Sequence, residues 1–164
     1  MRCFVRKIKR SKWKPVSFYS NERGIDTLNA DFLSTCLRTS LGCISLWEIT
    51  NDDDIYNVAV ELTIPGDRFD DLDFIILTEN DLQGIGLLPH KKPEGHTPYR
   101  ENHHELSGLN IKKINEISEL IYTRINETGR CKRVTAPEAK ASLEKQLNGG
   151  LKLPQELNIL KKIG

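Results

Sequence analysis

All four histidines of the chain fall within fifteen residues: His90, His96, His103 and His104 lie in the stretch LLPHKKPEGHTPYRENHHELSGLN. Imidazole is a common metal ligand and the side chain best suited to proton transfer near neutral pH. Glutamates are interleaved with the histidines and could complete a metal or catalytic site. The stretch therefore raises the question of enzyme chemistry before any other part of the sequence does.

The spacing of these histidines does not match a known ligand pattern. His103 and His104 are adjacent, so in extended backbone they point to opposite sides. Neither H-E-x-x-H nor C-x-x-C occurs, and we expect no metal and no cofactor. Loops longer than about 12–15 residues inside a domain are usually functional or disordered. We expect an ordered loop whose contact residues are His90, His96, Tyr99, Arg100, His103 and His104.

Charge is segregated along the chain, and its most uneven part is acidic. Residues 48–81 carry eleven Asp or Glu and one basic residue, Arg68. Such a block creates a potential that steers a partner of opposite charge. We expect a docking face for a basic protein, although a merely solvated rim would give the same pattern. Its residues would be Asp52, Asp53, Asp54, Asp67, Asp70 and Asp71, on the turns of a hairpin made by 43–50 and 55–64.

The alternative function is a metal-dependent hydrolase or nuclease. Asp71, Asp73 and Glu61 could bind Mg²⁺ beside the histidine loop. A nuclease of the PD-(D/E)xK type also needs a lysine two residues after the strand carboxylate. Neither Glu61 nor Asp73 is followed by one, so this remains the alternative.

A second alternative is nucleic-acid binding by the N-terminus. Residues 1–24 hold eight Lys or Arg against one Glu, with aromatic residues among them. Cations and stacking rings together are typical of single-strand binding surfaces. The pI of about 7.7 is low for this class, and no nucleic-acid-binding motif occurs. The candidate residues are Arg6, Lys7, Lys9, Arg10, Lys12, Trp13 and Lys14.

Periodicity and turn residues indicate one α+β fold. The clearest element is a helix after Asn110, with an apolar stripe that runs from Ile111 to Ile125. We expect an antiparallel or mixed sheet of four to five strands, packed by this long amphipathic helix and by shorter helices. The strands are expected at 2–10 (an edge strand protected by lysines), 43–50, 55–64, 73–78 and 130–134, and the domain at 1–129 with a helical extension, 130–164, packed on it.

Composition indicates the class of the protein and its cellular location. The chain has 164 residues, 38% of them hydrophobic, and no apolar run of the roughly 20 residues that a membrane span needs. We expect a cytoplasmic protein that contacts no membrane and whose four cysteines are buried free thiols. The preferred hypothesis is a non-enzymatic interaction module, such as an immunity protein, an antitoxin or an accessory subunit of a bacterial-type defence system.

Overall fold

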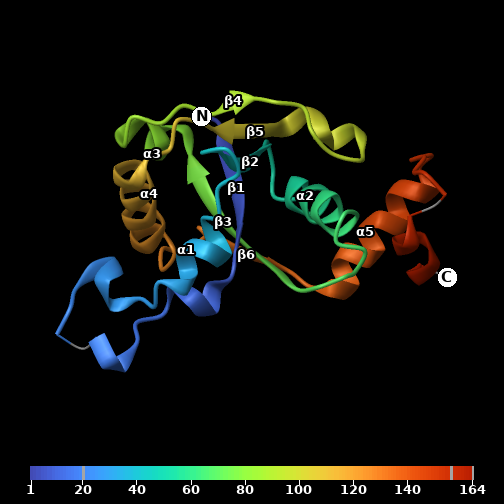
Figure 1. The fold of residues 1–164 in the computed structure, drawn as a ribbon. Coiled ribbons are helices and arrows are strands. Elements are labelled where there is room, and N and C mark those ends of the chain that lie inside the picture. The colour runs from blue at the N-terminus through green and yellow to red at the C-terminus, as the bar shows by residue number, and fades with distance from the viewer. Residues whose placement is uncertain (20, 156, 164) are drawn as a thin grey trace.

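A single antiparallel sheet forms the centre of the computed structural model, which describes residues 1–19, 21–155 and 157–163 (Figure 1). Its order is β4-β5-β2-β1-β3-β6. The α+β class with an antiparallel sheet is confirmed, but there are six strands rather than four or five. The strands are β1 Cys3–Ile8, β2 Ile44–Ile49, β3 Leu72–Thr78, β4 His90–Lys91, β5 His103–Leu106 and β6 Cys131–Val134.

Helices cover both faces of the sheet. In Figure 1, α1 and α4 lie on one side of it and α2 and α5 on the other. Within the described residues, no helix combines the length and apolarity needed to cross a membrane. The α-helices are α1 Asp31–Cys36, α2 Asp54–Thr63, α3 Glu79–Gly84, α4 Ile111–Arg124 and α5 Ala136–Asn148; the 3-10 helices are η1 Arg10–Trp13, η2 Ser17–Tyr19, η3 Gly24–Thr27, η4 Pro98–Asn102 and η5 Asn158–Lys162.

The first strand is central, so its predicted edge position was wrong. β1 pairs with β2 on one side and with β3 on the other. Phe4 and Val5, which point to opposite faces, are both fully buried. The cation in the middle of the strand is accommodated by hydrogen bonds, because Arg6 donates to the carbonyls of Cys36 and Ser45. Burial lowers the pKa of Arg6 to about 10, which still leaves it charged at neutral pH.

Residues 55–64 are helical, so the predicted strand and its hairpin were also wrong. The segment is rich in β-branched residues, which favoured a strand. The side chain of Asp54 accepts hydrogen bonds from the backbone N–H groups of Thr50 and Asn51, and this fixes the turn before α2. Ile55, Val58 and Ala59 have helical spacing and pack on the sheet. Tertiary burial therefore overrides the strand propensity of the β-branched residues.

The C-terminal segment packs on the rest of the chain. β6 adds to the sheet beside β3, and α5 lies against α2. A separate apolar cluster joins Val60 of α2 and Ile64, just after its end, to Leu143 of α5 and to Ile159. The four cysteines of the chain are free thiols, and only Cys36 is fully buried.

A buried carboxylate, that of Asp81, ties four elements together. It accepts from the backbone N–H and the hydroxyl of Thr78 at 2.8 Å each, at the start of α3. It also pairs with Arg124 at the end of α4 and with Arg130 just before β6. Burial by itself would raise the pKa of Asp81, but the Thr78 hydrogen bonds and the two arginines together lower it. The ionised carboxylate is therefore the form that stabilises the fold.

We expect Asp81→Asn to lower the free energy of unfolding at pH 7 by about 2 kcal/mol, because it weakens a helix cap and both ion pairs. The folded pKa lies below the unfolded value of about 3.9, so the ionic contribution is full above that value. It is lost as the pH falls through the folded pKa. Urea unfolding at pH 7 and at pH 3 should show the gap between the two proteins shrinking in acid. Asp53→Asn is the matched control, and equal losses in both variants would contradict the assignment.

Candidate functional site

The four histidines do not converge. His90 and His96 are exposed, whereas His103 and His104 are buried on β5. The prediction that the adjacent pair points to opposite sides is confirmed. His103 lies edge-on to Trp47 with ring centroids 4.8 Å apart, and His104 lies edge-on to Phe4 at 5.3 Å. Trp47 and Phe4 belong to the apolar clusters on opposite faces of the sheet.

His104 belongs to a closed polar network with Arg2 and Glu48. Its Nδ1 lies 2.9 Å from the carbonyl of Asn102, so this nitrogen carries the hydrogen. Its Nε2 lies 2.9 Å from the Arg2 guanidinium, which can only donate, so Nε2 accepts. Burial lowers the pKa of His104, which favours this neutral form. Arg2 in turn makes two hydrogen bonds to Glu48, and these hold the pKa of that carboxyl low.

This network joins strands, and both ring nitrogens of its histidine are engaged within the protein. A general base needs a nitrogen within hydrogen-bond reach of a substrate. Both nitrogens of His104 already have partners inside the protein, and the side chain is only 2% exposed. Arg2 also reaches Glu79 at the start of α3. The network thus links β1, β2, β5 and α3 at one end of the sheet.

The loop that carries the histidines is held by one buried carboxylate, Glu61 of α2. Glu61 is 3% exposed and accepts from the backbone N–H groups of His96 and Thr97, each at 2.7 Å, and from the Thr97 hydroxyl. Gly95 permits this approach, because a Cβ there would lie 2.5 Å from the Glu61 carboxylate. The loop is ordered by this contact.

Tyr99 and Arg100 take different roles in the loop. The Tyr99 hydroxyl donates to the carbonyl of Glu48 at 2.8 Å, and its ring stacks on Trp47. Burial raises the pKa of Tyr99, so the phenol stays protonated. Arg100 is exposed. Of the predicted contact residues, His90, His96 and Arg100 are therefore the ones with exposed side chains, and the others are packed against the fold.

The carboxylates of the hydrolase alternative are each bound to a partner within the protein. Asp73 forms a two-pronged ion pair with Arg133, at 2.8 and 3.0 Å. Asp71 accepts from the backbone N–H of Ala136 at the start of α5. Glu61 holds the histidine loop. Across residues 1–19, 21–155 and 157–163, no group of three or more His, Cys, Asp or Glu side chains is placed to hold a metal ion.

The predicted acidic face is divided between the two ends of α2. Asp52 and Asp53 precede the helix and Asp54 is its first residue, whereas Asp67, Asp70 and Asp71 follow it. Ten helical residues separate the groups by about 15 Å. Among the described residues, every acid of 48–81 has a partner for its side chain except Asp53 and Asp67. Asp53 is exposed and lies at the rim of a groove of about 590 Å³ between α2 and α5.

The N-terminal residues predicted to bind nucleic acid also lie in different environments. Lys12 pairs with Asp31, and Trp13 is buried against Phe32 with ring centroids 4.8 Å apart. Trp13 is therefore not available to stack on a base. The side chains of Lys7, Lys9, Arg10 and Lys14 are exposed, and no described carboxylate lies within ion-pair distance of them.

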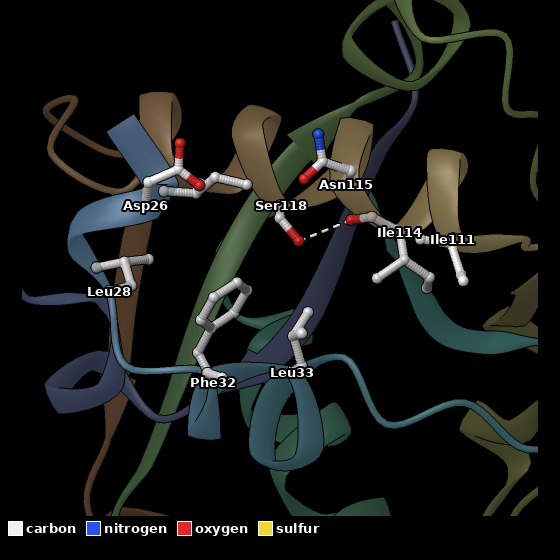
Figure 2. Close-up of a pocket in the computed structure, with 10 residues that line it drawn as sticks. Asp26, Leu28, Phe32, Leu33, Ile111, Ile114, Asn115 and Ser118 are labelled. Atoms are coloured by element: carbon white, nitrogen blue, oxygen red, sulfur yellow. Dashed lines mark hydrogen bonds between the residues drawn. The ribbon is translucent and has the colours of Figure 1, made fainter. Parts of the chain in front are cut away.

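An apolar groove between α1 and α4 is the surface that sequence reasoning missed. Figure 2 shows Phe32 and Leu33 of α1 facing Ile114 and Ser118 of α4 across it. The Ser118 hydroxyl bonds back to the carbonyl of Ile114 at 2.6 Å, and most of the other residues that line the groove are apolar. Its volume is about 300 Å³. Ile111, at the mouth, is 89% exposed.

A signal for this groove was present in the sequence. The stripe from Ile111 to Ile125 was interpreted entirely as core. Ile117 and Ile121 are indeed buried, but the stripe extends beyond the sheet at its N-terminal end. Leu33 is 39% exposed on the facing helix. An apolar stripe that extends past the core indicates that part of the stripe lies at the protein surface.

Comparison of the chain with protein-family models, with curated proteins and with solved structures finds no match.

We expect Glu61→Gln to loosen the loop, because an uncharged amide cannot accept all three hydrogen bonds. Amide hydrogen exchange at His96 and Thr97 should accelerate about tenfold, which corresponds to roughly 1.4 kcal/mol of local stability. The control is Glu94→Gln, an exposed residue of the same loop. Unchanged exchange at both amides in Glu61→Gln would show that the carboxylate does not hold the loop.

Proposed function

We propose that this protein is a non-enzymatic interaction module that docks on a basic protein in the cytoplasm. The observation that carries the proposal is the groove between α1 and α4, with Leu33 and Ile111 exposed at its mouth. Large apolar side chains that gather at a surface groove are typical of protein-binding sites. A partner that covers them gains the free energy of removing that apolar area from water.

Charge at the rim of the groove supports a basic partner. Asp26 lines the groove, and Figure 2 shows its carboxylate at the upper edge, on the α4 side. Glu119 of α4 lies next to Gly24, since a Cβ on that glycine would be 3.6 Å from its carboxylate. No described cation pairs with Asp26 or Glu119. A segment with apolar side chains flanked by Lys or Arg would complement both features.

The acidic residues before α2 offer a second, smaller contribution. Asp53 is exposed, lacks an ion pair among the described residues and borders the α2–α5 groove near Tyr56. We keep it as a secondary docking position, on a helix rather than a hairpin. The biological setting that we propose is an immunity protein, an antitoxin or an accessory subunit of a bacterial-type defence system. That setting rests on size and charge and on no residue of the groove.

The double variant Leu33→Ser/Ile111→Ser tests the groove. The partner is first captured from a native extract at about 0.15 M salt, where surface charge is already partly screened. Its affinity for purified variants is then measured. We expect the double variant to bind at least about tenfold more weakly, because both apolar contacts are lost, and to unfold at the wild-type temperature.

Two controls separate the possible surfaces. Leu88→Ser removes another exposed leucine that does not line the groove and should bind as the wild type does. Asp53→Asn reports on the α2–α5 groove. If Asp53→Asn weakens binding while Leu33→Ser/Ile111→Ser does not, docking occurs at the acidic position and the apolar groove is not the site.

A further inference from the structure

A second pocket, of about 360 Å³, lies where η1, the end of α4 and β6 meet. Three of its side chains are cationic: Arg10, Lys14 and Arg133. They come from segments more than a hundred residues apart in the sequence. The remaining residues that line it are Ser11, Trp13, Ile125 and Asn126.

The pocket carries an excess of positive charge. None of the described residues that line it is acidic, and no described carboxylate pairs with Arg10 or Lys14. Of the three described cations, only Arg133 is neutralised, by Asp73 on the neighbouring strand β3. Two positive charges therefore remain. The last carbonyls of α4 oppose an anion with about half an elementary charge, which is less than this excess.

Uncharged donors accompany the cations. Ser11 supplies a hydroxyl, and Asn126 supplies a carboxamide. Trp13 is 4% exposed, and its indole N–H has no hydrogen-bond partner in the described structure. Buried donors of this kind are nearly always paired in native proteins, and the unpaired indole belongs to a residue that lines this pocket.

The geometry points to a phosphate-binding site in this pocket. A phosphomonoester at neutral pH carries about 1.5 to 2 negative charges and a backbone phosphodiester carries one; both have several acceptor oxygens, and guanidinium groups bind them through paired hydrogen bonds. The Trp13 ring is fixed against Phe32, so the site recognises the phosphate and not a stacked base. The phosphate belongs either to a free phosphate or phosphomonoester or to the backbone of a nucleic-acid strand. This site is independent of the docking groove and of the function proposed for it.

The two tryptophans of the chain give a direct readout, since Trp13 and Trp47 each contribute one indole N–H signal in a nitrogen-15 NMR spectrum. One sample is titrated with inorganic phosphate, and another with a short single-stranded oligonucleotide, both against chloride at equal ionic strength. We expect a saturable shift of the Trp13 signal while the Trp47 signal stays in place. Saturation by inorganic phosphate identifies a free phosphate or monoester site, and saturation by the oligonucleotide alone identifies a strand backbone. No saturable shift with either probe overturns the proposal.

Substitutions test the assignment of the donors. Arg10→Gln/Lys14→Gln should weaken binding at least tenfold, because it removes both unpaired charges from the pocket. Lys152→Gln/Lys161→Gln removes two exposed cations that do not line it and should bind as the wild type does. Trp13→Phe keeps an aromatic ring but removes the N–H, and a weaker affinity in this variant assigns that donor. Wild-type affinity in Arg10→Gln/Lys14→Gln overturns the site even if Trp13→Phe does not fold.

Discussion

The ion pairs of Asp81 with Arg124 and Arg130 are the interaction on which the rest of this structure depends. Through them the start of α3, the end of α4 and the turn before β6 share one buried carboxylate. The antiparallel pairing of β3 with β6 adds another such ion pair, because it sets Asp73 opposite Arg133. Three acids of the block, Asp52, Asp73 and Asp81, thus form ion pairs with basic residues of 124–133.

Local signals predicted the elements that are determined locally. Asn110 accepts from the N–H of Lys113 at the start of α4, and Thr135 and Glu138 form the capping box of α5. Such caps span three or four residues and can be read from the sequence. The elements that were predicted wrongly depend on distant contacts. The central place of β1 requires two partner strands far along the chain, and the helical form of 55–64 requires the sheet and α5 on either side of it.

The candidate sites likewise combine residues that are visible as local patterns with residues that are distant in the sequence. The histidine cluster was visible as a pattern, but the group that positions its loop is Glu61, thirty-five residues before His96. Arg10 and Lys14 were recognisable as cations available to an anion, whereas the third cation of their pocket is Arg133. No local rule joins residues so far apart. Composition can thus suggest which chemistry is available, and only the fold shows which side chains share a pocket.

The central position of β1 has a consequence for how the chain reaches its native state. β1 is synthesised before both of its partners, since β2 begins at Ile44 and β3 at Leu72, so its apolar side chains stay unpaired until those strands have been made. Pairings this distant in sequence close slowly, because loop entropy must be lost before the contacts form. Cations in or beside a strand disfavour its pairing with other chains, so we expect Arg6, Lys7 and Lys9 to protect the strand while it is unpaired. The same cations predicted an edge strand. In the folded protein β1 has a partner on each side, so we expect their protective effect before β2 and β3 have paired with it.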